Sequence, residues 1–266
     1  MAYVENRTIH DADSHVMEFP ETIGEFMSKK HLDQFKPFMR SRDEDWVNQM
    51  KALQDDPAYC SGAEREIMLR RGHMALGAFR KDDRPRALDY LGFTSQLMFT
   101  TDSLDNYGLE TGETNELACE AARAHNRMMA DFCSVDKRLL ATGYVPLVDF
   151  DEAPRIASEA LEMGCKGLII PSRCPPGHSP SHVAFEPLWS VAEQAGVPVL
   201  FHVGGEHKMN TDYHHNGGPQ VLDFHGGAEN FTSTSFMTIP LSVWQTMSVL
   251  LIDGVLDRHQ DLKFAA

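Results

Sequence analysis

The sequence predicts an α/β fold: a TIM-type (β/α) barrel, incomplete at its C-terminus, with a helical insertion after the first strand. Short apolar runs alternate with amphipathic segments of helical period along the second half of the chain, which is typical of parallel strands buried on both faces. Glycines stand where those helices should end. At 266 residues the chain is long enough for one barrel domain, which typically needs about 250 residues.

Six strands are expected; apolar or β-branched residues dominate the last five, and the first is more polar. In chain order they are Thr8–Val16, Ser95–Thr101, Ala141–Leu147, Gly167–Pro171, Val197–Val203 and Leu262–Ala266. The helices expected between the later strands are Asn115–Val135, Asp151–Gly164, Phe185–Gly196 and a segment from about Pro240 to His259. Because a TIM barrel closes with eight strands, we expect the chain to be part of a longer barrel.

Strand–helix alternation alone also permits an open, doubly wound sheet. No GxGxxG or GxxxxGK[ST] motif follows any strand, so a nucleotide-binding sheet has no support and the barrel is favoured. Two segments interrupt this single domain of residues 1–266: a polar, mostly helical insertion over about 20–90, and a Gly-, His- and Asn-rich loop over about 204–236. Both follow the C-terminal end of a strand, where barrels build active sites.

Composition and charge exclude several classes of function. The chain holds 24 Lys and Arg against 39 Asp and Glu, a formal net charge of −15, which repels nucleic acid and anionic membrane surfaces. Its five cysteines form no CxxC pair and are expected as free thiols in a reducing cytoplasm. The first residues lack the regions of a signal peptide. We therefore expect a cytoplasmic homo-oligomer, a dimer, that binds a small-molecule substrate and neither nucleic acid nor membrane.

The first strand carries the residues most suggestive of chemistry, Asp13 and His15. Side chains at positions i and i+2 of a strand point to the same face, so this carboxylate and imidazole are expected side by side, with Asp11 on the same face. A carboxylate and an imidazole can together hold Zn²⁺ or Mn²⁺. The alternative is a polar strand end in which Asp13 bonds to a neighbouring backbone N–H.

His202 lies near the end of the fifth expected strand. A single histidine in a buried strand is more often a core residue with satisfied hydrogen bonds than a metal ligand. Its place at the C-terminal end of the strand nevertheless puts it on the rim where barrel enzymes bind substrate. Asp13, His15 and His202 are therefore candidate ligands of one catalytic metal ion, which keeps an open position for water or substrate.

Stretches along nearly the whole chain resemble the amidohydrolase-related family, in the branch that contains aminocarboxymuconate-semialdehyde decarboxylase and related aromatic-acid decarboxylases. The matching stretches, in the family's order, are IHDADSHVMEFPE, ALDYLGFTSQLMFTT, AHNRMMADFCSVDKRLLATGYVPL, GCKGLIIPSR, VPVLFHVGG and SVLLIDGVLDRHQDLKFAA. The resemblance implies a distorted TIM barrel with one divalent metal ion, Zn²⁺ or Mn²⁺. The family's first-strand motif, HxH or ExH, is DxH here, so Asp13 and His15 take two ligand positions. His202 corresponds to the family's fifth-strand histidine.

The resemblance also implies residues at positions after Ala266. The family's further metal ligand is an Asp at the end of strand eight, and several members use a sixth-strand His as acid or base. The catalytic acid or base therefore stays unknown. Two reactions are compatible with the remaining ligands: decarboxylation, a C–C lyase reaction, of a carboxylate-bearing substrate, and hydrolysis of an ester, lactone or amide. A non-catalytic partial barrel that serves as a metal-binding, oligomeric scaffold is the alternative to an enzyme.

Candidates for binding an anionic substrate are basic residues near expected strand ends. Arg173 directly follows the fourth strand, and Arg84 and Arg86 precede the second. Glu18, three residues after His15, is a candidate base or a neighbour of the ligands. For each of these residues the alternative is a solvated surface charge or a polar loop.

Overall fold

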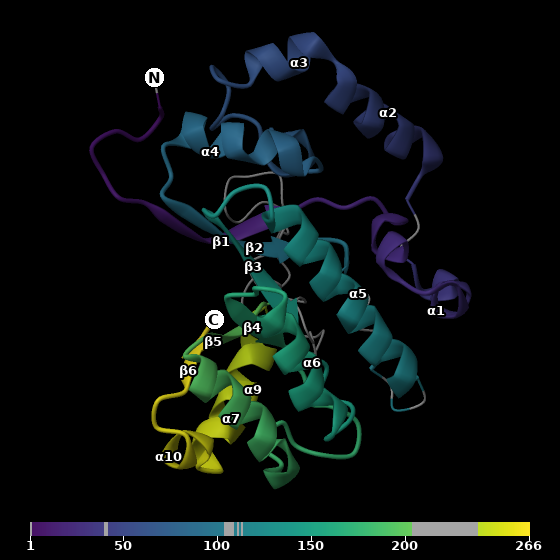
Figure 1. Cartoon of the computed structure of the whole chain (residues 1–266), viewed down its shortest axis with the longest axis vertical. Coiled ribbons are helices and arrows are strands. Elements are labelled where there is room, and N and C mark those ends of the chain that lie inside the picture. Colours follow the sequence, from purple (N-terminus) through teal and green to yellow (C-terminus); the bar gives the residue numbers. More distant parts are fainter. Residues whose placement is uncertain (1, 40–41, 104–108, 111, 113, 204–238) are drawn as a thin grey trace, which may run out of the picture.

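The structure is a computed structural model of the chain and describes residues 2–39, 42–103, 109–110, 112, 114–203 and 239–266. Six strands pair in parallel and in chain order into one sheet. They are β1 (His10–Val16), β2 (Ser95–Thr100), β3 (Leu139–Tyr144), β4 (Gly167–Ile170), β5 (Pro198–Phe201) and β6 (Lys263–Ala265). The sheet curls, with helices between its strands, so the fold is a partial TIM-type barrel, as the sequence predicts (Figure 1).

The strands are the apolar runs that the sequence indicates, with small differences at their ends. β4 is buried along its whole length. β3 begins at Leu139, before the expected start, and ends at Tyr144, because Pro146 has no N–H with which to extend the ladder. Gly143 in this strand allows close packing on the next helix, since a Cβ there would lie 2.7 Å from the Cβ of Ala160.

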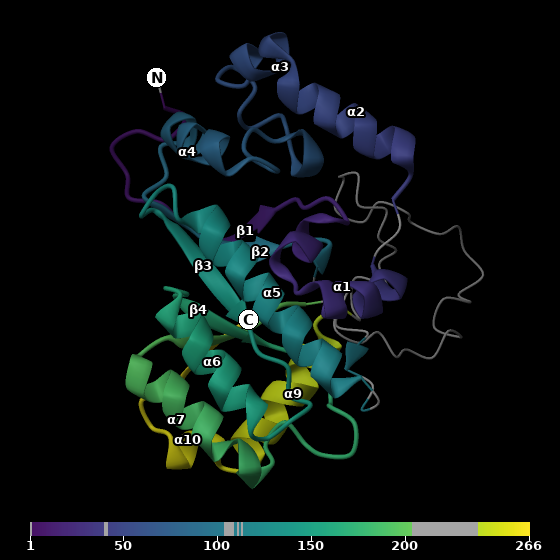
Figure 2. The same ribbon diagram turned by 45° about the vertical axis from the view of Figure 1, so that its right-hand side comes forward.

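Three helices lie along one face of the curled sheet (Figure 2): α5 (Asn115–Cys133), α6 (Glu152–Glu162) and α7 (Glu186–Ala195). The expected helix from 240 to 259 is instead two helices, α9 (Leu241–Ile252) and α10 (Val255–Arg258). Gly254 separates them because it adopts a φ of 73°, a left-handed conformation that ends a helix and that glycine accepts without strain.

The insertion after β1 is helical, as expected, and contains α1 (Lys29–Phe35), α2 (Glu44–Asp55), α3 (Pro57–Gly62) and α4 (Arg84–Leu91). An ion pair connects it to the strand ends: the guanidinium of Arg42 lies 2.5 Å from the carboxylate of Asp102, which is buried just after β2. The predicted loop over 204–236 lies outside the described residues.

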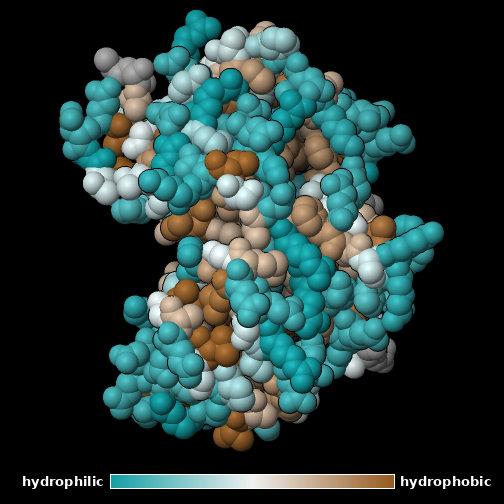
Figure 3. Space-filling view, viewed as in Figure 1, coloured by the Kyte–Doolittle hydropathy of each residue, from teal (hydrophilic) through white to brown (hydrophobic). Residues whose placement is uncertain are grey.

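Apolar side chains fill the space between the sheet and its helices, with Met98, Leu168 and Trp189 fully buried. The face in Figure 3 is mainly hydrophilic, with hydrophobic patches between the helices. Within the described part of the chain, no helix is both long enough and apolar enough to cross a membrane.

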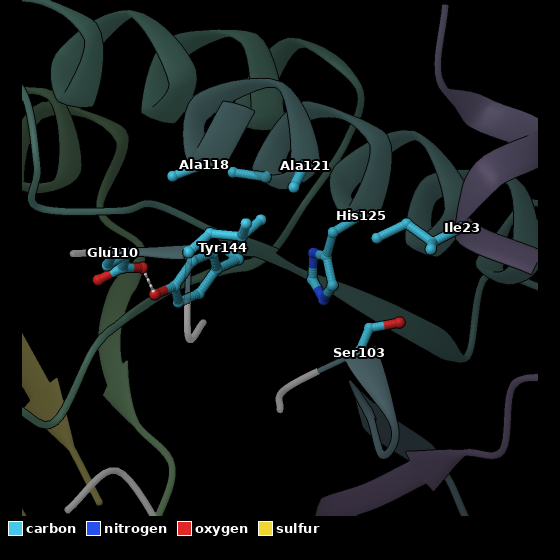
Figure 4. A pocket seen from close by; sticks show the side chains of 9 residues that line it. Ile23, Ser103, Glu110, Ala118, Ala121, His125 and Tyr144 are labelled. Carbon is cyan, nitrogen blue, oxygen red and sulfur yellow. Dashed lines mark hydrogen bonds between the residues drawn. The ribbon is translucent and has the colours of Figure 1, made fainter. Parts of the chain in front are cut away.

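A polar cluster is buried between α5 and the ends of β2 and β3. Tyr144 donates a hydrogen bond to Glu110, and the ring of His125 lies 3.2 Å from the hydroxyl of Thr100. Figure 4 shows Tyr144 and His125 side by side at a cavity of about 10 Å³. Burial raises the pKa of Glu110 to about 7 and lowers that of His125 to about 4, because the charged forms lose hydration.

We predict that Glu110→Gln stabilises the protein more at pH 8 than at pH 5. Exposed Glu ionises near pH 4.5, whereas the pKa of Glu110 in the folded protein is about 7. Between these values the unfolded chain loses its proton first, so the free energy of unfolding falls as pH rises. Gln does not ionise and avoids that loss.

Urea unfolding at the two pH values measures the difference between Glu110→Gln and the unmodified protein. The control Glu44→Gln, at an exposed helix position, should show no such pH dependence. An equal effect of Glu110→Gln at both pH values would contradict the raised pKa.

Candidate metal centre

The strands β1 and β5 bring together the three residues predicted as metal ligands. Asp13 and His15 lie on β1, and His202 directly follows the last residue of β5. β1 and β5 are not neighbours in the sheet, yet the rings of His15 and His202 touch across its concave side, with centroids 5.0 Å apart. The curl of the sheet therefore assembles a site from residues 187 positions apart in the chain.

One atom of each side chain points into a common space. Nε2 of His15 lies 3.1 Å from Nε2 of His202. Oδ1 of Asp13 lies 3.4 Å from Nε2 of His15 and 3.6 Å from Nε2 of His202. Within the described residues, these are the three His, Cys or acidic side chains whose potential ligand atoms gather within 4.8 Å.

The separations fit a divalent ion. Bonds of about 2.0–2.1 Å at tetrahedral angles place neighbouring ligand atoms about 3.3 Å apart, close to the three distances observed. Two Nε2 atoms 3.1 Å apart also require a proton or a cation between their lone pairs. One carboxylate oxygen with two imidazole nitrogens suits Zn²⁺ or Mn²⁺.

Contacts on the far side of each ring direct its Nε2 toward the cluster. Nδ1 of His202 donates to the backbone carbonyl of Val203 at 2.9 Å. Nδ1 of His15 lies 3.0 Å from the hydroxyl of Thr101. A histidine that donates through Nδ1 keeps the lone pair of Nε2 for a metal ion, and metal-binding histidines commonly have such a partner.

The charges in the cluster shift two pKa values in opposite directions. Hydrogen bonds from His15 and then His202 hold the pKa of Asp13 well below its usual range. Burial lowers the pKa of His202, but its hydrogen bonds to Asp13 and to the Val203 carbonyl outweigh burial and raise it overall. Asp13 is thus an anion at neutral pH, the form that binds a cation.

Asp11 does not belong to the cluster, contrary to the expectation from strict alternation. Its carboxylate accepts hydrogen bonds from Nε2 of Gln96 at 3.0 Å and from the backbone N–H of Asp13 at 3.2 Å. The pairing of β1 with β2 shifts register between Asp11 and Ser14. Such a bulge changes which side chains share a face.

Both carboxylate oxygens of Glu18 accept hydrogen bonds from the backbone after β2. Glu18 is 4% exposed, and its two carboxylate oxygens accept the backbone N–H groups of Thr101 at 3.0 Å and Ser103 at 2.6 Å. Burial raises its pKa, although these hydrogen bonds oppose the shift. Glu18 therefore fixes the segment whose Thr101 contacts His15.

The three arginines proposed for substrate binding have different surroundings. Arg173 follows β4, next to Ser172, whose hydroxyl donates to the carbonyl of His202 at 3.2 Å. Among the described residues, Nη2 of Arg173 is buried and has no hydrogen-bond partner. Arg86 on α4 pairs with Asp83 at 3.0 Å. Arg84 is buried, lines the pocket next to Asp13 and His15, and donates to atoms of Ser14, His15, Gly77, Gln96 and Met98.

A pocket of about 400 Å³ borders the cluster at Asp13, His15 and Thr101. Its walls include apolar side chains of the insertion, Ile67 and Leu76 among them. This space is large enough for a small organic molecule, since ligand pockets start at about 300 Å³.

A sequence model of the family described as amidohydrolase matches residues 11–266. None of the curated proteins matches the chain. Among solved structures, an amidohydrolase from Mycobacterium avium subsp. paratuberculosis is similar, with a TM-score of 0.62 and 19% identity over 98% of this chain and 73% of that one.

Two decarboxylases share the fold at lower identity. The 5-carboxyvanillate decarboxylase from Novosphingobium aromaticivorans, solved with manganese and 3-methoxy-4-hydroxy-5-nitrobenzoic acid, has a TM-score of 0.57 and 16% identity over 97% of this chain and 65% of that one. A dihydroxybenzoic acid decarboxylase from Polaromonas sp. JS666, solved with manganese and 2-nitroresorcinol, has a TM-score of 0.50 and 13% identity over 97% of this chain and 64% of that one. This chain thus spans slightly less than two thirds of either decarboxylase. By the family match over residues 11–266, the chain belongs to the amidohydrolase family.

Proposed function

We propose that this chain forms the metal-binding part of an enzyme that decarboxylates a small, carboxylate-bearing organic substrate. The observation that carries the proposal is the meeting of Asp13, His15 and His202 at the C-terminal ends of β1 and β5, the edge where barrels bind substrate. The two decarboxylases of similar fold hold manganese, which favours Mn²⁺ as the ion, with Zn²⁺ as the alternative.

A divalent ion bound here would supply positive charge that holds a substrate carboxylate or lowers the pKa of a coordinated water. Asp13, His15 and His202 would hold that ion. Thr101 and the Val203 carbonyl orient the two rings. In the reaction the bond between carbon and carboxylate breaks, CO₂ leaves, and the electron pair left on carbon takes up a proton.

Arg173 is the residue that we propose binds the substrate carboxylate. It lies three residues after the end of β4, which pairs with β5, the strand that His202 follows. A buried guanidinium N–H without an acceptor costs free energy, and a carboxylate accepts such N–H groups in pairs. Among the described residues, Arg173 therefore offers a buried donor that no protein atom fills.

Hydrolysis of an ester, lactone or amide is the second candidate. The same three ligands can serve an ion that activates water, and the solved structure with a TM-score of 0.62 is described as an amidohydrolase. The two reactions differ in their product, because only decarboxylation releases CO₂.

We predict that the protein binds Mn²⁺ and that His202→Ala weakens this binding by more than about 100-fold, because loss of a residue that merely orients a ligand already costs about 10–100-fold. Titration followed by the electron paramagnetic resonance of free Mn²⁺ measures the affinity. His10→Ala, on the same strand as Asp13 but outside the cluster, should bind as the unmodified protein does. Unchanged affinity in His202→Ala would refute the ligand assignment.

With Mn²⁺ bound, the protein should release ¹³CO₂ from aromatic acids labelled in the carboxylate, with 5-carboxyvanillate and dihydroxybenzoic acids as the first compounds to try. Mass spectrometry detects the gas, and protein treated with a chelator is the control. If the protein releases no CO₂ from any of the acids but converts esters or lactones to their product acids, the reaction is hydrolysis.

Arg173→Gln should lower kcat/KM for the carboxylate substrate by about 10–100-fold, since a hydrogen bond to a charged group contributes roughly 1.5–3 kcal/mol. Mn²⁺ affinity should stay within twofold, because Arg173 is not a ligand. Arg86→Gln, which removes an arginine paired with Asp83, is the matched comparison. An equal loss in both variants would argue against a specific role for Arg173.

A further inference from the structure

The strand that carries Asp13 and His15 has an irregular pairing. Asp11 pairs with Gln96, and the next paired residue, Ser14, lies opposite Met98. Two residues of β1, Ala12 and Asp13, therefore face the single residue Leu97 of β2. This arrangement is a β-bulge, which turns the side chains of the bulged strand away from their regular direction.

Arg84, at the start of α4, contacts residues on both sides of this bulge. Its Nη2 donates to the hydroxyl of Ser14 at 2.6 Å, and its Nη1 donates to the carbonyl of His15 at 3.2 Å. On the other side of the bulge, its Nε donates to Oε1 of Gln96 at 2.9 Å. Gln96 in turn donates to the carboxylate of Asp11 at 3.0 Å. One guanidinium thus fixes both ends of the bulge.

The position demands an arginine. Arg84 is 6% exposed, and burial lowers its pKa to about 10, because a buried charge loses hydration. Only a guanidinium presents several donors in one rigid plane, whereas the ammonium of Lys is a compact point charge. The backbone carbonyl of Gly77, in the insertion, is a fourth acceptor of the Arg84 guanidinium, at 3.2 Å.

We propose that Arg84 is a positioning residue for the metal site: by fixing the bulge in β1, it sets the directions in which Asp13 and His15 point. The inference rests on the proposed metal-binding function. Binding sites need their ligands held within roughly 0.5 Å and 10–20° of the productive geometry. Without the hydrogen bonds of Arg84, the bulged segment of β1 is free to shift, which would displace the carboxylate of Asp13 relative to Nε2 of His15 and of His202.

A purely structural role for Arg84 predicts a different result. If the network only stabilised the fold, its loss would lower the free energy of unfolding of the metal-free protein and leave the affinity of the folded protein for a metal ion unchanged. Positioning predicts weaker metal binding by protein that is folded.

Two substitutions and a control separate these roles. Arg84→Lys keeps the charge and cannot make the several bonds of the guanidinium. Ser14→Ala removes one acceptor beside the bulge and disturbs the fold least. The control is Arg123→Lys, because Arg123 also connects two elements through several hydrogen bonds, but to Glu152 and Glu159 of α6.

Mn²⁺ affinity and the visible spectrum of the Co²⁺-loaded protein are the measurements, with urea unfolding of the metal-free protein beside them. We expect Arg84→Lys to weaken Mn²⁺ binding about 10–100-fold and to alter the Co²⁺ bands, which report ligand geometry. Ser14→Ala should do both to a smaller degree, and Arg123→Lys should do neither. Combined with Asp13→Asn, the loss from Arg84→Lys should be less than additive, because both changes act on one ligand.

The outcomes distinguish this inference from the proposed function. If the unmodified protein binds neither Mn²⁺ nor Co²⁺, the proposed function is wrong and the inference fails with it. If the unmodified protein binds metal and both Arg84→Lys and Ser14→Ala keep its affinity and Co²⁺ spectrum, only the positioning role is wrong. Should Arg84→Lys fail to fold, unchanged binding in Ser14→Ala overturns the inference by itself.

Discussion

The curl of a parallel sheet is the constraint on which the candidate site depends. Parallel strands all end at the same edge, and curling brings β1 opposite β5, so that His15 and His202 meet through nitrogens 3.1 Å apart. A flat sheet with the same strand order would keep three strands between them. The helices α5, α6 and α7 pack against one face of the curled sheet, and the apolar core reaches the site itself, because the ring of Phe99 lies against those of His15 and His202, with centroids 6.0 and 5.4 Å away.

Much of this arrangement could be predicted from the sequence because two of its causes are local. Apolar runs of strand length, separated by segments with helical periodicity, indicate parallel strands. The end of each run shows which residues lie at the C-terminal edge of the sheet, where the candidate site is. The positions of Asp13 and His15 in one strand, and of His202 at the end of another, therefore sufficed to nominate three residues that the structure brings within 4.8 Å.

The rest depends on contacts between distant segments, which periodicity does not encode. Regular alternation placed Asp11 beside Asp13, but the bulge shifts the register between Asp11 and Ser14. Arg84 looked like a candidate for substrate because it is charged, whereas its donors are occupied by β1, β2 and the insertion. The glycine at position 254 was readable in the sequence, yet its left-handed φ of 73° and the resulting helix break were not.

The central claim is that Asp13, His15 and His202 bind one divalent ion. The most direct measurement is a crystal structure of the protein soaked with Mn²⁺, with the ion located by its anomalous scattering. The account predicts one strong peak at bonding distance, about 2.0–2.2 Å, from Oδ1 of Asp13 and from Nε2 of both histidines. A peak elsewhere, or imidazoles of His15 and His202 turned away from each other with no ion between them, would contradict it.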